Sequence, residues 1–192
     1  NILYSGGDDV FAIGKWDKVI LFADEVRKSF RRFVGRADIS ISAGIVILTP
    51  DYPIAKAAEL AGDSESKAKD FDGCGKGLPQ KNAVNMFGEN VSWQGEFDAV
   101  LKLKTEFVDL IEKEGMPRSI LHRLMTLCGK MKSGDMSYMW HTAYFLKRFS
   151  DGKTDSVKNF CYRMKAELCD RRKYELTAVA ARWAELELKF KN

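Results

Sequence analysis

The sequence contains little of the two residue types that most often bind zinc or form covalent cross-links. It has two histidines and four cysteines among 192 residues. The cysteines form no CxxC pair and lie far apart, which argues against both a zinc knuckle and a disulfide framework. We therefore expect reduced structural cysteines at Cys74, Cys128, Cys161 and Cys169. His122 and His141 have no HxxxH or HD partner, and we expect them to be structural as well.

The sequence also has no long apolar run. No stretch approaches the roughly 20 residues that a helix needs to span a bilayer, and no basic segment followed by an apolar leader is present. A hydrophobic content of 45% and a charged content of 30% are typical of a globular protein. We expect a cytoplasmic protein without a membrane partner. Because the chain begins without Met and inside a strand-like run, we also expect it to be a piece of a longer protein.

The charges are unevenly distributed along the chain. Residues 1–92 contain 12 Lys and Arg against 13 Asp and Glu, a net charge of −1, whereas residues 93–192 contain 19 against 14, a net charge of +5. The second half is therefore better suited to contact a polyanion. A solvated helical surface explains the same charges equally well.

The stretch "NILYSGGDDVFAIG" at the start of the chain predicts a hairpin. Short β-prone runs at 2–4 and 10–13 flank a glycine pair. Gly6 and Gly7 can adopt positive φ and let another molecule approach the backbone closely. Asp8 and Asp9 follow at the start of an apolar strand, where carboxylates are costly unless their charge is compensated. A divalent cation would compensate it.

The rest of the chain divides into two patterns. Asp17 is expected to cap a helix that exposes Arg27, Lys28, Arg31 and Arg32. Beyond it we expect a central strand covered on both faces over 39–48, a helix over 54–70, a Gly- and Pro-rich loop and a strand over 83–87. From Trp93 onward the pattern is helical, with further helices expected over 118–131, 137–149, 156–170 and 173–189. The predicted domains are therefore 1–92 and 93–192, joined near residues 88–92.

This order of elements, with acidic residues at the hairpin turn, resembles the palm of polymerases and nucleotide cyclases. "SISAGI" is similar to the central strand of GGDEF-type diguanylate cyclases, and "AAELA", "SKAKD" and "KNAV" resemble that family's alanine-rich helix and the basic-Asn dipeptide after it. "YSGGDDVFAIGKWD", the stretch from Pro53 to Glu59 and "KNAVNMFG" more closely resemble the large polymerase-like subunit of type III-A (Csm-type) CRISPR-Cas effector complexes. The implied fold class is α+β, a partial ferredoxin-like palm followed by an all-α helical bundle.

The resemblance implies a nucleotidyltransferase that converts ATP into cyclic oligoadenylates when the guide RNA has paired with a target RNA. Such chemistry uses two Mg²⁺ (or Mn²⁺) ions about 4 Å apart, bound by carboxylates. Asp8 and Asp9 are the implied metal ligands and catalytic residues. Ser5, Gly6 and Gly7 would admit the ATP ribose or base, and Lys69 and Lys81 would contact the triphosphate. Each of these residues also has a plain reading as a solvated turn or surface side chain.

The resemblance also implies elements outside this chain. Palm enzymes take a further carboxylate from a strand that precedes the hairpin, so we expect the isolated 192-residue chain to be inactive. The family has other complex subunits as partners, often an upstream HD domain that cuts single-stranded DNA, and a helical domain along the guide-target duplex. Under that reading the cluster Arg171, Arg172 and Lys173 could contact phosphates.

Two other readings stay open. A stand-alone diguanylate-type cyclase is disfavoured because Asp9 and Val10, not Glu and Phe, follow the first acidic residue after the glycines, and because a long helical domain is appended. A non-catalytic scaffold that binds RNA or subunits is disfavoured by the intact aspartate pair.

Overall fold

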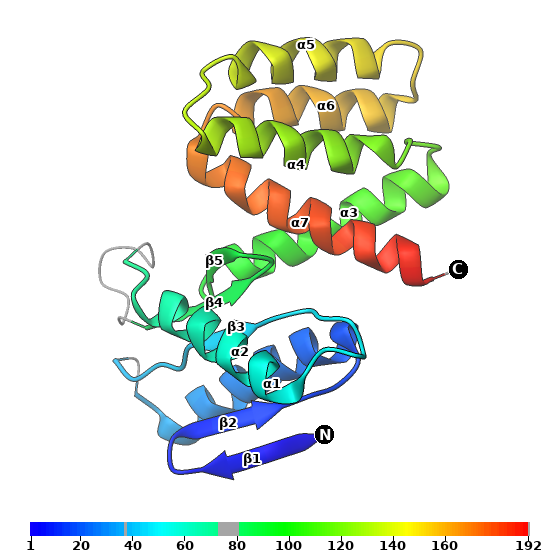
Figure 1. The fold of residues 1–192 in the computed structure, drawn as a ribbon. Coiled ribbons are helices and arrows are strands. Elements are labelled where there is room, and N and C mark those ends of the chain that lie inside the picture. Colours follow the sequence, from blue (N-terminus) through cyan, green and yellow to red (C-terminus); the bar gives the residue numbers. More distant parts are fainter. Residues whose placement is uncertain (37, 73–80, 192) are drawn as a thin grey trace. The chain divides into compact units, whose positions relative to one another are not determined.

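The computed structural model describes residues 1–36, 38–72 and 81–191, which form two compact units, Asn1–Phe97 and Asp98–Asn192 (Figure 1). Small β-sheets and helices precede a wholly helical part, so the predicted α+β class is confirmed. The chain begins with β1 (Ile2–Gly6), β2 (Asp9–Ala12), α1 (Trp16–Val34), β3 (Ala43–Ile45), α2 (Ile54–Lys69), β4 (Ala83–Met86) and β5 (Glu89–Ser92). It continues with α3 (Glu96–Lys113), α4 (Ser119–Lys132), α5 (Tyr138–Ser150), α6 (Asp155–Glu167) and α7 (Arg171–Phe190).

The expected hairpin is present. Strands β1 and β2 pair antiparallel as a sheet of their own, with Gly6 opposite Asp9. Gly7 and Asp8 are therefore the two loop residues, and Gly7 has φ +62°. A positive φ at the first loop position is the conformation that a type II′ hairpin turn requires, which explains the glycine.

A second sheet is built around β4. Strand β3 pairs with β4 in parallel, and β4 pairs with β5 antiparallel. Helix α2 connects the two parallel strands as the crossover of a βαβ unit. All four residues of β4 are buried, so this strand lies at the centre of the first unit's core.

Gly44 on β3 allows α2 to lie directly against the strand. A Cβ at this position would lie 2.3 Å from the carbonyl oxygen of Ala61 and 2.3 Å from the backbone nitrogen of Glu65. Only a residue without a side chain permits such an approach. Beside this contact the hydroxyl of Ser64 donates to the side-chain oxygen of Asn85 at 2.7 Å, a buried bond between α2 and β4.

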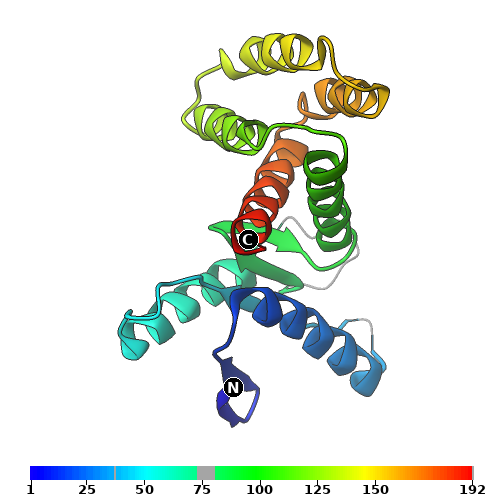
Figure 2. The same cartoon turned by 90° about the vertical axis from the view of Figure 1, so that its right-hand side faces the viewer.

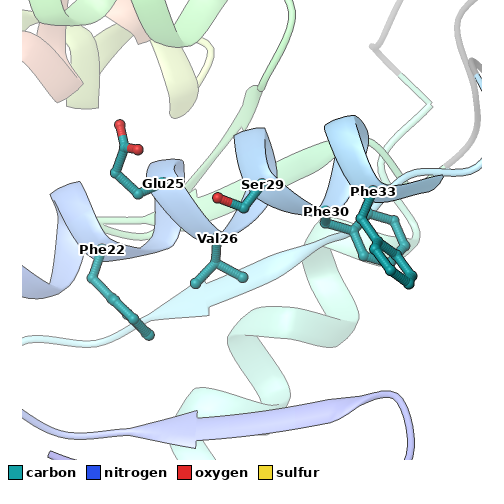
Figure 3. A pocket seen from close by; sticks show the side chains of 6 residues that line it. All are labelled: Phe22, Glu25, Val26, Ser29, Phe30 and Phe33. Carbon is teal, nitrogen blue, oxygen red and sulfur yellow. The ribbon is translucent and has the colours of Figure 1, made fainter. Parts of the chain in front are cut away.

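Helix α1 has an apolar face and a basic face. Phe22, Val26, Phe30 and Phe33 project from one side and, together with Glu25 and Ser29, line a groove of about 470 Å³ (Figure 3). The predicted exposure of Lys28, Arg31 and Arg32 is confirmed, whereas Arg27 is half-buried. The apolar face is only partly covered by the described residues, since Phe33 is 91% exposed.

Three expectations for the first unit are wrong. Asp17 does not cap α1: the helix already begins at Trp16, so this carboxylate lies in the first turn, where the helix dipole favours it. The strand expected over 39–48 is only three residues long, because β3 has a strand neighbour on one side among the described residues and Ile47 and Leu48 are exposed. The boundary expected near residues 88–92 falls in strand β5 and the turn before it at Phe87 and Gly88, whereas the two compact units divide after Phe97.

The second unit is all-helical, as expected. Helices α4 and α7 pack closely, and α5 lies beside α6 (Figures 1 and 2). The ring of Phe107 on α3 meets that of Phe160 on α6 with centroids 5.3 Å apart, and the Tyr174 hydroxyl lies 2.7 Å from that of Thr142. Asp170 caps α7 by accepting from the backbone N–H of Lys173.

No helix among the described residues is long and apolar enough to cross a membrane. Within the same part of the chain Cys128, Cys161 and Cys169 are free thiols, as expected, and Cys74 lies outside the described residues. Burial raises the pKa of Cys128 to about 11 and also raises that of Cys161.

We predict that Gly44→Ala destabilises the first unit. The added methyl group meets backbone atoms that cannot rotate away, so the free energy of unfolding should fall by about 2–3 kcal/mol, the upper part of the range for overpacking. Urea denaturation measures this loss. Gly62→Ala on the facing helix is the matched control, because no atom lies within 4 Å of its added Cβ. That change should stabilise by about 0.5–1 kcal/mol through helix propensity, and equal losses in both variants would contradict the close approach.

We further predict that one described thiol reacts quickly with Ellman's reagent at pH 8. Cys169 is exposed, whereas the raised pKa values of Cys128 and Cys161 deplete their thiolates at every pH below the shifted values. With Cys74 replaced by Ser in every variant, Cys169→Ser should remove the fast phase and Cys128→Ser should leave it unchanged. A fast phase of two or more thiols in the folded protein would refute the assignment.

Candidate functional site

The acidic turn between β1 and β2 presents two neighbouring carboxylates on an open backbone. Asp8 lies at the tip of the turn and Asp9 is the first residue of β2, and both are exposed. No atom lies within 4 Å of where a Cβ of Gly7 would stand. A Cβ on Gly6 would meet only the flexible end of the Tyr4 side chain, at 2.7 Å. A ligand can therefore approach the backbone of this turn directly.

Ser5 precedes the glycines on β1 and lies opposite Val10 in the register. Its side chain is exposed. The predicted group Ser5, Gly6, Gly7, Asp8 and Asp9 is thus continuous in space as well as in sequence, because all five belong to one tight hairpin.

Lys69 ends α2 within the electrostatic reach of the acidic turn. Its ammonium pairs with Glu65 at 2.8 Å, one helical turn earlier. The hydrogen bond from Glu65 raises the pKa of Lys69 above its usual value, and the charges of Asp9 and Asp8 add smaller contributions in the same direction. The two carboxylates of the hairpin therefore contribute, after Glu65, to the raised pKa of this cation on α2.

Lys81 stands in an unusual backbone conformation just before β4. It has φ +63°, and its carbonyl oxygen accepts a 2.5 Å hydrogen bond from the hydroxyl of Ser42. Its side chain is exposed and, among the described residues, has no hydrogen bond or ion pair. Among the described residues no hydrogen bond or ion pair joins Lys81 to the acidic turn, and its contact with a triphosphate stays a prediction.

The donor set of the turn matches the requirements of magnesium. Among residues 1–36, 38–72 and 81–191, no three His, Cys, Asp or Glu side chains are grouped to hold a metal on their own. Mg²⁺ is commonly bound by one or two carboxylates together with water and substrate phosphates. Asp8 and Asp9 are carboxylates of the type that such an ion binds, and their binding of a metal stays a prediction.

The two histidines lie elsewhere. His141 stacks on the ring of Trp140 with centroids 3.8 Å apart, as expected of a structural residue. His122 is exposed rather than packed, because it faces outward from α4. Sequence reasoning did not single out Glu65, although its i,i+4 spacing from Lys69 is a recognisable ion-pair signal.

Comparison with known proteins places these features in a family. A model of the second palm domain of Cas10/Cmr2 matches residues 1–79. The chain is 32% identical over 171 residues to a Mycobacterium tuberculosis protein described as "CRISPR system single-strand-specific deoxyribonuclease Cas10/Csm1 (subtype III-A)", covering 85% of this chain and 20% of that protein.

Other relatives agree. The protein of the same description from Streptococcus thermophilus is 26% identical, over 83% of this chain and 21% of its own length. The "CRISPR system Cmr subunit Cmr2" of Pyrococcus furiosus is 36% identical over 77 residues, 38% of this chain and 9% of that protein. The chain thus spans about a fifth of the length of the Csm1 relatives.

We predict that Glu65→Gln lowers the pKa of the Lys69 ammonium toward its ordinary value, because Glu65 is the main group that raises it. Titration of the Lys69 side chain by NMR measures the shift. Asp63→Asn, an exposed carboxylate on the same helix, is the control and should leave the pKa unchanged. Adding Asp8→Asn and Asp9→Asn to the Glu65→Gln variant should lower it further, and an unchanged value would mean that the acidic turn does not face Lys69.

Proposed function

Because this chain belongs to the Cas10 family, as a segment of the Csm1 type, we propose that it carries the nucleotide-joining centre of a type III-A CRISPR effector subunit. The reaction is the conversion of ATP into cyclic oligoadenylates, in which a 3′-hydroxyl of one nucleotide attacks the α-phosphate of another and pyrophosphate leaves. One observation carries the proposal: two exposed carboxylates on a bare glycine turn lie within the electrostatic reach of Lys69.

The residues of the proposed site have different roles in binding the metal, the triphosphate and the nucleoside. Asp8 and Asp9 would bind the magnesium, which neutralises phosphate charge and polarises the attacking hydroxyl. Lys69 acts as a point charge on triphosphate oxygens, and Lys81 is the second candidate for that role. Ser5, Gly6 and Gly7 leave room for the ribose or base against the backbone.

Glu65 competes with a phosphate for Lys69, and this competition suits a site that must release its product. With the site empty, the 2.8 Å ion pair holds the ammonium at the last turn of α2. A triphosphate brings a stronger negative charge to the same ammonium and can replace Glu65 as its main partner.

The remaining activities are assigned to the whole protein. We extend to it the single-strand-specific deoxyribonuclease activity in the names of the Csm1 relatives, and place that activity outside this chain. Other effector subunits, guide RNA and target RNA are its proposed partners. A diguanylate-type cyclase and a non-catalytic scaffold are the alternatives that the following experiment separates.

We predict that Asp8→Asn combined with Asp9→Asn abolishes oligoadenylate synthesis by the full-length protein in its complex, with a loss of at least about 100-fold because the metal ligands are gone. The measurement is RNA-triggered conversion of labelled ATP, with GTP in a parallel reaction. Asp51→Asn, an exposed carboxylate in a turn remote in sequence from the hairpin, is the matched control and should keep full activity.

The other outcomes each identify a rival. Retained RNA-dependent function without any nucleotide conversion in the unmodified complex would indicate a scaffold. Conversion of GTP to a cyclic dinucleotide, without target RNA, would indicate a diguanylate-type cyclase. Cleavage of single-stranded DNA should be unchanged in the double variant, since that activity is placed elsewhere in the protein.

A further inference from the structure

The C-terminal half of α1 concentrates positive charge in an otherwise acidic unit. Between residues 26 and 36 the sequence has five basic residues and no acidic one, whereas residues 1–92 as a whole carry a net charge of −1. Arg27 and Arg31 form one i,i+4 row, and Lys28 and Arg32 form the next. Like charges at this spacing destabilise a helix by a few tenths of a kcal/mol per pair, roughly as much as opposite charges stabilise it.

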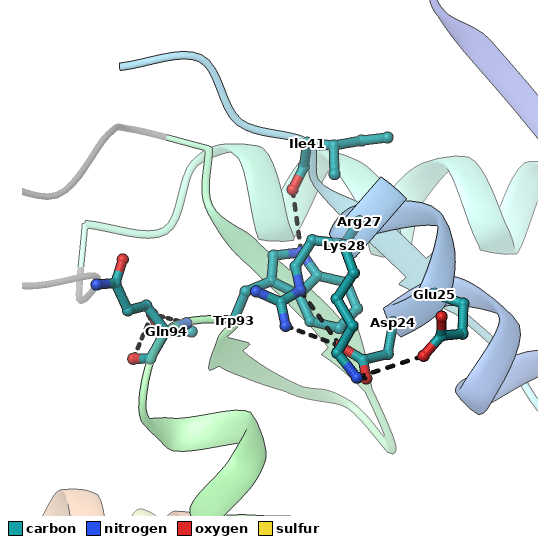
Figure 4. A network of polar contacts seen from close by, with 8 residues as sticks. Asp24, Glu25, Arg27, Lys28, Ile41, Trp93 and Gln94 are labelled. Atoms are coloured by element: carbon teal, nitrogen blue, oxygen red, sulfur yellow. Dashed lines mark hydrogen bonds and ion pairs between the residues drawn. The ribbon is translucent and has the colours of Figure 1, made fainter. Parts of the chain in front are cut away.

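The carboxylates nearby engage only the first turn of this basic face. Arg27 donates two hydrogen bonds to the buried carboxylate of Asp24, at 3.2 and 2.9 Å, and its guanidinium lies over the ring of Trp93 (Figure 4). Lys28 pairs with Asp24 at 2.6 Å and with Glu25 at 3.4 Å. These contacts hold the N-terminal end of the basic face in place and compensate part of its charge.

The positive charge of the next helical turn is not compensated by a carboxylate of the described residues. Within the described part of the chain Arg31 has no ion pair, and Arg32 donates only to the hydroxyl of Ser29, at 3.3 Å. Both side chains are exposed. Arg27, Lys28, Arg31 and Arg32 border an open surface depression of about 620 Å³, with Glu25 as its only acidic member.

From these observations we propose that the basic face of α1, formed by Arg27, Lys28, Arg31 and Arg32, binds the phosphodiester backbone of a single-stranded nucleic acid. Two arginines one residue apart present planar forks that match phosphate oxygens, and they are held on a helix rather than a loop. The depression is open and follows the helix for more than a turn, which suits a chain of phosphates better than one enclosed nucleotide. The inference does not depend on the cyclase chemistry, because none of these residues belongs to the acidic turn.

The contrast with the basic cluster on α7 strengthens this choice. Arg172 and Arg171 both pair with Glu175, at 3.2 and 3.7 Å, and the backbone N–H of Lys173 is bound by the capping Asp170. The two arginines of that cluster, which the sequence presents as a phosphate contact, thus already share the carboxylate of Glu175. Arg31 and Arg32 pair with no carboxylate of the described residues, so a phosphate does not have to displace one there.

The test is binding of a fluorescein-labelled, mixed-sequence single-stranded RNA to the full-length protein, followed by fluorescence anisotropy over a range of salt concentrations. Arg31→Gln combined with Arg32→Gln removes two charges. If both contact phosphates, the slope of log affinity against log salt should become shallower by about 1.4, or 0.7 for each lost contact. Affinity should fall to a similar degree for RNAs of different sequence.

The matched control removes the same net charge elsewhere. Lys56→Gln on α2 and Lys102→Gln on α3 replace two exposed lysines that have no ion pair in the described residues. If this variant lost as much RNA affinity as the double arginine variant, net charge alone would explain the effect, and the proposal would be overturned. Arg31→Lys combined with Arg32→Lys retains the charge and should retain the slope.

The remaining outcomes are equally decisive. Circular dichroism shows whether the double glutamine variant folds. If it does not fold, the single variants Arg31→Gln and Arg32→Gln are compared instead, and each should make the slope shallower by about 0.7. Unchanged RNA binding overturns the proposal. Unchanged RNA binding together with lost assembly of the effector complex would assign this face to an acidic protein partner instead.

Discussion

The backbone contact between α2 and β3 at Gly44 is the constraint on which the first unit depends. It brings the helix so near the strand that a methyl group would meet the backbone of Ala61 and Glu65 at 2.3 Å. The buried bond from Ser64 to Asn85 ties the same part of the helix to the neighbouring strand, and Gly44 and Asn85 are partners in the register. Because Lys69 is one turn beyond Glu65 on this rigidly held helix, the position of its ammonium is set by a glycine that is not itself part of the site.

Much of this fold could be predicted from the sequence, and the exceptions have physical reasons. The hairpin and the helices were predictable because their turn residues and apolar periodicity are strong local signals. Strand β5 was not, because its turn places Phe87 at φ 55°, a conformation that large side chains rarely adopt and that no sequence rule anticipates there. The length of β3 was overestimated because an apolar run predicts burial, while Ile47 and Leu48 are exposed in the absence of a second neighbouring strand among the described residues.

The candidate site was predictable in its residue types and less so in its arrangement. Adjacent carboxylates beside paired glycines predict a cation-binding turn from local chemistry alone, and this metal site stays a prediction. That the charges of Asp8 and Asp9 contribute to the raised pKa of Lys69 depends on the packing of α2 and could be obtained only from coordinates. Its pairing with Glu65 is local and was missed, although both residues lie on one predicted helix face. Lys81 shows the opposite case, since the resemblance groups it with Lys69 while its side chain has no partner in the described residues.

In the first unit the carboxylates of the β1–β2 turn and the basic residues of α1 lie on separate elements, which would let one small domain serve both proposed functions. Its net charge is only −1, yet two adjacent carboxylates stand at the β1–β2 turn, while residues 26–36 contain five basic residues and no acidic one. The proposed metal site needs carboxylates, whereas direct contact with a phosphodiester backbone needs cations, so the two proposed functions use different residues. Asp24 compensates only the first part of the basic face, because its buried carboxylate pairs with both Arg27 and Lys28. It anchors the first turn of the basic face and leaves Arg31 and Arg32, farther along the helix, with their charge uncompensated.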